Sequence, residues 1–480
     1  MKRWNLIPIL LGMAVVLLPM SACSRPAGDP FDPTAAVPTR APTDWYAFNQ
    51  DFGAVDVKPV GLSKIPATKL DLPDDYQVGF QEPLSDGGCI TAAFVPVDAA
   101  DTSYEKGSYL RLVRFGRDGR RAWDRALDSE AFHGYVVGLC VFGDDGFAVA
   151  VRTAKDTSGT DTLDRLLRFS SSGQPQWDSD VGIFVAGALE KVFATPDGAV
   201  LSAGTVPSPD GGETVDNDVA LHRIEKDGTV SKQVVLGTPG YEYLMDASYA
   251  APLGLVVAWR TEDFSSAGDG SAFSTFSRVA GFDDSLEQVW SRDIDKKTSL
   301  FEVQVLAGGQ GTYLLGSTRL ESLPDQASGA SFDFVDPDGE TVWSYSLELP
   351  QSWVRGAVRL IDGRTVLGIS HPSEGNLQET TMLTVFSTTG GIVGQIPAPP
   401  GGIRWVKETR DGGFTVCTVQ TLKGLPQPPY VSSMWTDSEA VVAHYDADLK
   451  LVWMRSIDQY KDTMRNDRIL ATVDDRLLVS

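Results

Sequence analysis

The sequence predicts an all-β fold, and more specifically a β-propeller, from three observations. A repeat of 51 to 59 residues runs through the body of the chain. Each repeat contains two tight-turn signals between short apolar runs, the pattern expected of four strands joined by hairpins. No segment after the N-terminal region shows the periodicity of an amphipathic helix. Four-stranded units repeated at this period are typical of propeller blades.

The hairpin between the third and fourth strands marks the repeat most clearly. An aromatic or aliphatic anchor is followed eight residues later by a position that is tryptophan in five of the seven repeats. The seven pairs are Phe115 and Trp123, Phe169 and Trp177, Ile224 and Lys232, Phe282 and Trp290, Val335 and Trp343, Phe386 and Gly394, and Tyr445 and Trp453.

An earlier turn joins the first and second strands of each repeat. It is centred on glycine, usually after aspartate, because glycine accepts a positive φ without a Cβ clash. We expect the strands of the second repeat at 135–142, 147–152, 163–169 and 176–181. The turns are Asp86-Gly87-Gly88, Asp145-Gly146, Asp197-Gly198, Gly254, Gly308-Gly309, Asp362-Gly363 and Asp411-Gly412-Gly413.

The two ends of the chain bear on the number of blades. The C-terminal "DRILATVDDRLLVS" reads as two strands around Asp474-Asp475. In the N-terminal "WYAFNQDFGAVDVKPV", Phe48 stands eight residues before Asp56, which matches the second half of a repeat. Joining these half-blades gives eight four-stranded blades and removes open sheet edges. The alternative is seven blades with additional terminal strands.

A resemblance follows from the spacing Gly-x-x-x-Trp at Gly119/Trp123, Gly173/Trp177 and Gly339/Trp343. It resembles the tryptophan-docking motif of eight-bladed quinoprotein-like (PQQ-like) propellers, which include dehydrogenases and non-enzymatic lipoproteins. In that family the tryptophan packs between blades. The resemblance therefore implies a structural, inter-blade role for Trp123, Trp177, Trp290, Trp343 and Trp453.

The N-terminal region predicts export and lipid anchoring. Lys2 and Arg3 precede an apolar stretch, which is the pattern of a signal peptide. Met20-Ser21-Ala22-Cys23 resembles a bacterial lipobox, which makes Cys23 the lipidated mature N-terminus. We expect a signal peptide at 1–22, a flexible Pro/Ala/Thr-rich tether at 23–44 and a propeller at 45–480. The alternative is an ordinary secretory signal with an incidental cysteine.

Charge and cysteine content exclude several classes of protein. Asp and Glu number 64 against 41 Lys and Arg, a net charge of −23, which disfavours nucleic-acid partners. Beyond Cys23 only Cys89, Cys140 and Cys417 remain, too few for a disulfide framework. We expect buried free thiols, and a Cys89–Cys140 bridge stays open as an alternative.

The sequence contains no recognisable catalytic motif. The adjacent cysteines of the quinoprotein dehydrogenases, an EF-hand loop, a nucleophile elbow and a phosphate-binding loop are all missing. The four histidines fall in different repeats and form no closely spaced pair. We expect no catalytic residue, no metal and no cofactor.

Strand order predicts where a partner binds. In a four-stranded blade the two tight turns share one face, and the longer connections share the other, where binding loops usually accumulate. We expect a monomeric, lipid-anchored, non-catalytic scaffold or protein-binding module at the bacterial cell envelope. Alternatives are a peptide- or carbohydrate-binding surface lipoprotein and a degenerate quinoprotein-like enzyme. Candidate binding residues on the second face are Tyr241, Tyr243, Trp353, Arg355, Arg404, Trp405 and Tyr460.

Overall fold

The computed structural model contains seven four-stranded antiparallel sheets and one three-stranded sheet. It describes residues 67–73, 76–96, 108–127, 133–154, 162–179, 188–208, 217–237, 241–263, 274–294, 300–308, 311–319, 328–347, 353–372, 379–399, 401–409, 411–421, 437–461, 469–471 and 477–479. The predicted signal peptide, Cys23, the tether and the start of the predicted propeller lie outside the described residues. Among those that are described, no helix is long and apolar enough to cross a membrane.

The first four blades follow one another along the chain. Blade 1 contains β2 (Gln77–Pro83), β3 (Cys89–Pro96), β4 (Ser108–Phe115) and β5 (Arg121–Ala126). Blade 2 contains β6 (His133–Val141), β7 (Phe147–Ala154), β8 (Thr162–Phe169) and β9 (Pro175–Ser179). Blade 3 contains β10 (Ala188–Ala194), β11 (Val200–Pro207), β12 (Asn217–Ile224) and β13 (Val230–Leu236). Blade 4 contains β14 (Tyr241–Ala250), β15 (Gly254–Asp263), β16 (Ser274–Phe282) and β17 (Gln288–Ile294).

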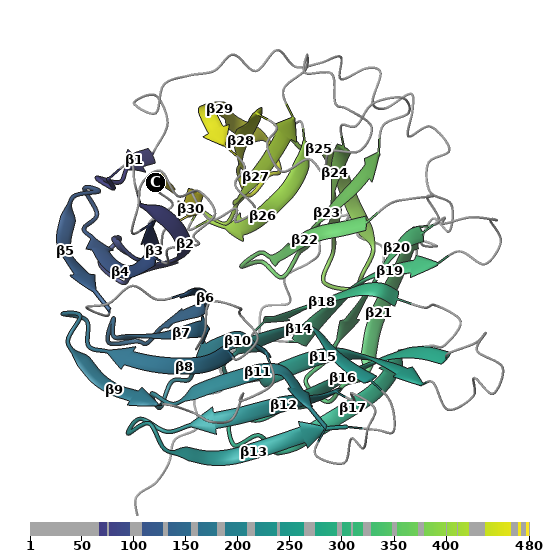
Figure 1. Cartoon of the computed structure of the whole chain (residues 1–480). Coiled ribbons are helices and arrows are strands. Elements are labelled where there is room, and N and C mark those ends of the chain that lie inside the picture. Colours follow the sequence, from purple (N-terminus) through teal and green to yellow (C-terminus); the bar gives the residue numbers. More distant parts are fainter. Residues whose placement is uncertain are drawn as a thin grey trace, which may run out of the picture. The chain divides into compact units, whose positions relative to one another are not determined.

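Three further blades continue the same order (Figure 1). Blade 5 contains β18 (Leu300–Gly308), β19 (Gly311–Arg319), β20 (Ser328–Val335) and β21 (Thr341–Leu347). Blade 6 contains β22 (Trp353–Arg359), β23 (Thr365–Pro372), β24 (Glu379–Phe386) and β25 (Ile392–Pro397). Blade 7 contains β26 (Gly402–Glu408), β27 (Phe414–Thr421), β28 (Asp437–Tyr445) and β29 (Leu451–Lys461).

The predicted β-propeller is confirmed. The described residues form seven four-stranded blades, which is the alternative number, and not the eight four-stranded blades expected first. The first strands of many neighbouring blades contact each other, as in β6 with β10 and β14 with β18, so these strands form the inner wall. The strands of blade 2 fall within two residues of their predicted bounds.

The eighth sheet joins the two ends of the chain but has three strands. Its order is β1 (Ala67–Lys69), β31 (Leu477–Val479) and β30 (Ile469–Ala471). β30 and β31 are the two strands expected at the C-terminus, whereas β1 pairs with β31 in parallel. The expected N-terminal hairpin around Phe48 and Asp56 lies outside the described residues.

The hydrophobic core is divided among the boundaries between blades. One cluster joins Leu112 of blade 1 to Phe147 and Phe169 of blade 2, and another joins Leu221 of blade 3 to Phe282 of blade 4. The repeat anchor Phe115 is fully buried. Each blade therefore completes its core only against its neighbours, which is why the repeat is stable as a ring and not as single units.

The three described cysteines are buried and free. Burial raises the pKa of the Cys89, Cys140 and Cys417 thiols to about 12 in each case. A thiol with such a pKa is neutral and unreactive at physiological pH. The expected buried free thiols are therefore confirmed, and the alternative of a Cys89–Cys140 bridge is wrong.

Candidate binding surface

The two faces of the propeller differ in the regularity of their connections. All seven turns between third and fourth strands contain five residues, as in 116–120 and 446–450. On the opposite face, the connections between second and third strands range from six residues at 373–378 to fifteen at 422–436. We call the first face the turn face and the second the loop face.

Turns on the turn face satisfy their own polar groups. In the turn that starts at Thr195, the Thr195 N–H donates to Ala199 O at 3.0 Å and the Gly198 N–H donates to Thr195 O at 3.0 Å. The Asp197 carboxylate accepts the Ala199 N–H at 3.3 Å. Aspartates therefore recur in these turns because they cap backbone N–H groups. In the described part of the chain, no group of three or more His, Cys, Asp or Glu has a metal-binding arrangement.

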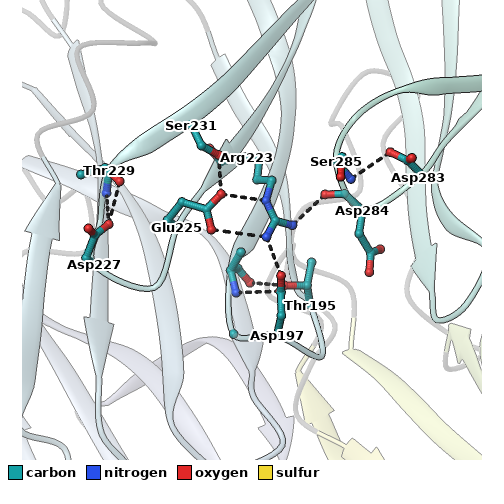
Figure 2. Close-up of polar contacts among 12 residues, drawn as sticks. Thr195, Asp197, Arg223, Glu225, Asp227, Thr229, Ser231, Asp283, Asp284 and Ser285 are labelled. Atoms are coloured by element: carbon teal, nitrogen blue, oxygen red, sulfur yellow. Dashed lines mark hydrogen bonds and ion pairs between the residues drawn. The ribbon is translucent and has the colours of Figure 1, made fainter.

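Arginine links turns of neighbouring blades on this face (Figure 2). Arg223 at the end of β12 donates to Asp284 O of the blade 4 turn at 2.7 Å and to Glu225 of its own turn at 2.9 Å. It also donates to Asp197 at 2.5 Å. The Thr195 hydroxyl, together with Arg223, lowers the pKa of Asp197 to about 2. The hydrogen-bonding groups of Arg223 are therefore used within the protein, and the cluster keeps a net negative charge from its two carboxylates.

Four of the five predicted inter-blade tryptophans contact the turn of the following blade. Trp177 of blade 2 packs on Gly228 in the blade 3 turn, and its indole N–H donates to Lys226 O at 2.8 Å. A Cβ added at Gly228 would stand 3.1 Å from the Trp177 ring. Close contacts between an indole ring and a turn glycine also join Trp123 to Gly173, Trp290 to Gly339, and Trp343 to Gly390. Trp453 of blade 7 stacks on His444 of its own blade, with ring centroids 5.9 Å apart.

This pairing explains the gaps in the sequence motif. Blades 3 and 6 carry Lys232 and Gly394 in place of tryptophan, and the blades that follow them carry Leu286 and Leu449 in place of the docking glycine. Both leucines adopt a positive φ, 56° and 64°. Tryptophan and glycine are therefore absent together at these two boundaries, although the two positions lie in different repeats.

The inner strands carry a feature that the sequence analysis did not predict. Each first strand has a β-bulge, at which one residue has no partner in the second strand. Bulges change the direction of the strand and the aim of a side chain, and they are frequent near binding sites. The bulged residues of blades 1 to 7 are Gly79, Val137, Glu190, Met245, Phe301, Arg355 and Arg404.

Two predicted binding residues are bulged residues of adjacent blades. Arg355 lies in β22 and Arg404 in β26. Arg404 is exposed, and Trp405 beside it is half-buried with the Lys407 ammonium 5.9 Å from the centroid of its ring. Trp353 is the first residue of β22.

The other predicted residues occupy different blades. Tyr241 and Tyr243 lie at the loop-face end of β14 in blade 4, and the Tyr243 side chain is 40% exposed. Arg260 and Glu262 of the adjoining strand form an ion pair near Tyr243. Tyr460 lies near the end of β29, the fourth strand of blade 7. The predicted residues of the first strands therefore lie in blade 4 and in blades 6 and 7, whereas Tyr460 lies on the fourth strand and not at the start of a first strand as predicted.

A polar cluster on the loop-face half of blades 3 and 4 was not predicted. Lys191 of β10 forms an ion pair with Asp246 of β14 at 3.0 Å, which links the inner strands of the two blades. The bulged Glu190 accepts a hydrogen bond from the Thr205 hydroxyl at 2.9 Å. Burial raises the pKa of Glu190, and the cations of Arg152 and Lys191 oppose that shift.

A sequence signal for the bulges does exist. In five of the seven blades the bulged residue stands five positions before the first residue of the following turn, as Arg404 does before Thr409. Aligning the repeats on that turn would have placed Glu190, Arg355 and Arg404 in one column. The register that leaves this column unpaired could be read only from the structure.

Comparisons with known proteins find likeness at the level of solved structures only. A eukaryotic initiation factor has a TM-score of 0.41 and 10% identity, covering 82% of this chain and 90% of its own. The β-propeller domain of the Trilobed protease from Pyrococcus furiosus has a TM-score of 0.39 and 8% identity, covering 82% and 98%. Drosophila Semaphorin 2a has a TM-score of 0.41 and 6% identity, covering 75% and 74%. No family model and no curated protein matches the chain.

Proposed function

We propose that this chain is a lipid-anchored, non-catalytic β-propeller that binds a protein partner at the bacterial cell envelope through its loop face. The observation that supports this most is the contrast between the two faces. The turn face consists of short turns with internally satisfied polar groups. The loop face carries every long connection, together with exposed aromatic and cationic residues such as Tyr243 and Arg404.

The anchor in this proposal rests on the sequence. Cys23 in Met20-Ser21-Ala22-Cys23 would carry the lipid, and the tether at 23–44 would separate the propeller from the membrane. About twenty flexible residues span a root-mean-square distance of roughly 25 Å, so the loop face could reach partners close to the membrane. A Cys23→Ala variant should leave the membrane fraction, and continued fractionation with membranes would contradict the anchor.

Site-specific photo-crosslinking in cells tests the binding face. A photoreactive amino acid replaces Tyr243 on the loop face or, as the matched control, the exposed Lys226 on the turn face. We expect discrete crosslinked proteins from position 243 and none from position 226. Crosslinking from 226 alone, or from neither position, would contradict a loop-face binding function.

A further inference from the structure

The bulged positions of the inner strands differ in charge around the propeller. Blades 1 and 2 carry Gly79 and Val137 there, blade 3 carries Glu190, and the adjacent blades 6 and 7 both carry arginine. The whole chain has a net charge of −23. Two cations at the same register of neighbouring inner strands are therefore a local exception to the charge of the protein.

The two arginine bulges lie side by side. Gly356 follows the bulged Arg355, and a Cβ added at Gly356 would stand 3.5 Å from the side chains of Ile403, directly before the bulged Arg404, and Val406, two residues after it. β22 and β26 are also in contact as neighbouring first strands. The backbone thus brings Arg355 and Arg404 to adjoining positions on the inner wall of blades 6 and 7.

The surroundings of Arg404 add to this basic character. Arg404 is exposed, and Lys407 on the same strand lies over the ring of Trp405. Blades 3 and 4 differ, since Glu190 and Asp246 bring carboxylates to the same half of their inner strands. Asp246 is paired with Lys191, and β26 also carries the exposed Glu408 at its other end, so the contrast rests on the bulged positions themselves, arginine in blades 6 and 7 and glutamate in blade 3.

We propose that Arg355 and Arg404 bind the carboxylates of an acidic segment of the protein partner. The proposal rests on the proposed function and names the chemistry of the partner. Guanidinium groups hold carboxylates through paired, charge-assisted hydrogen bonds, and two adjacent arginines can hold neighbouring acidic side chains. The net negative charge of the protein weakens the binding of such a segment at other surfaces.

The test uses fluorescein-labelled hexaglutamate and the full chain in neutral detergent, with fluorescence anisotropy as the readout. The wild type should bind hexaglutamate, bind it more weakly as salt increases, and not bind hexaglutamine. The double variant Arg355→Gln/Arg404→Gln should weaken binding at least tenfold. The matched control Arg120→Gln removes a cation of the turn face whose side chain is 86% exposed, and it should leave binding unchanged.

If the double variant does not fold, Arg404→Lys replaces it in the test. Lysine keeps the positive charge but cannot form the paired hydrogen bonds of a guanidinium group, so the variant should bind hexaglutamate severalfold more weakly. Equal binding by the double variant, or by hexaglutamine, overturns the proposal. An oligogalacturonate that binds more tightly than hexaglutamate overturns the peptide occupant in favour of an acidic glycan. If these assays fail while crosslinking at position 243 still captures a partner, the binding function stands without this chemistry.

Discussion

The boundary between blades 2 and 3 and the boundary between blades 3 and 4 solve the same packing problem differently. At the first, Trp177 covers Gly228, and the bare glycine lets the indole approach the turn. At the second, Lys232 replaces the tryptophan and Leu286 replaces the glycine, with Leu286 buried among residues of β12 and β13. The volume between blades is filled from the preceding blade in one case and from the following blade in the other.

The difference teaches that a boundary, and not a repeat, is the unit on which side-chain choice depends. Leu286 has a φ of 56°, a conformation that costs a residue with a Cβ about 1–2 kcal/mol. Burial of a leucine side chain contributes about 1.5–3 kcal/mol, which offsets that cost. The exchange is favourable only where no tryptophan competes for the space.

Gly339→Leu should break a tryptophan boundary most strongly. Gly339 has a φ of 86°, and a Cβ there would stand 2.7 Å from the Trp290 ring. Overpacking costs about 1–3 kcal/mol and the left-handed conformation about 1–2 kcal/mol, so we expect a loss near 4 kcal/mol by urea denaturation. The wild-type leucine at the equivalent position 286 shows that the turn itself accepts leucine.

The compensating variant Trp290→Lys/Gly339→Leu sharpens the comparison. It converts this boundary to the composition of the boundary between blades 3 and 4. We expect it to be at least 2 kcal/mol more stable than the sum of the two single variants predicts, because contacting residues couple by such amounts. If the stability losses of the two single variants simply add, leucine does not compensate for the loss of tryptophan at this boundary.

Most of the fold could be predicted from the sequence because the turns are chemically explicit. Glycine-centred turns and the anchor-to-tryptophan spacing indicated two hairpins in each repeat, and in blade 2 they gave the bounds of all four strands. The local details of the turns were harder. The sequence suggested Gly146 as the turn glycine of blade 2, whereas Asp145 adopts the positive φ, 60°. Turn length fixes which residue is left-handed, and an aspartate tolerates that position.

Trp177→Ala should have the next largest effect. The variant loses the stacking of the indole on Gly228 and its hydrogen bond to Lys226 O. Truncation of a buried aromatic costs about 3–5 kcal/mol, and the partial exposure of Trp177 puts the expected loss near 3 kcal/mol. Urea denaturation measures it, and Trp177→Phe, which keeps an aromatic ring without the N–H, should lose about half as much.

An unchanged midpoint for Trp177→Ala would contradict a structural role for the docking tryptophans. The inter-blade role of the tryptophans was implied by family resemblance. The pairing of each tryptophan with a glycine in the turn of the following blade was found only in the structure. The sequence could not predict this pairing, because the pairing depends on which turn of the following blade each indole contacts.

The candidate site was less predictable than the fold. Aromatic and arginine residues at the start of inner strands could be recognised, and they gave Tyr243, Arg355 and Arg404. Arg355 and Arg404 are equivalent because each is the bulged residue of the first strand of its blade. The propensities of single residues do not predict where such a bulge forms. Polar partners such as Lys191 and Asp246 come from different blades, so their ion pair depends on tertiary packing.

Leu286→Gly tests the leucine boundary from its other side. The variant removes a side chain that is 1% exposed and also relieves the strain of the positive φ. Removal of buried leucine atoms costs about 2–5 kcal/mol, and relief of strain returns about 1 kcal/mol, so we expect a net loss near 2 kcal/mol. Leu449→Gly at the boundary between blades 6 and 7 should lose less, because Leu449 is only partly buried, and a stabilised protein in either case would refute the filling role of leucine.

Lys232→Ala should have the smallest effect of the series. Lys232 forms an ion pair with Glu287 of the next blade, but the two side chains are 30% and 74% exposed. Solvent screens such pairs, and they contribute about 0.2–1 kcal/mol. We expect a loss of that size in urea denaturation at low salt, decreasing as salt increases, whereas the Trp177→Ala loss should not depend on salt. A loss as large as that of Trp177→Ala would mean that Lys232, and not Leu286, fills the space between blades 3 and 4. Both boundaries would then be stabilised by a side chain of the preceding blade.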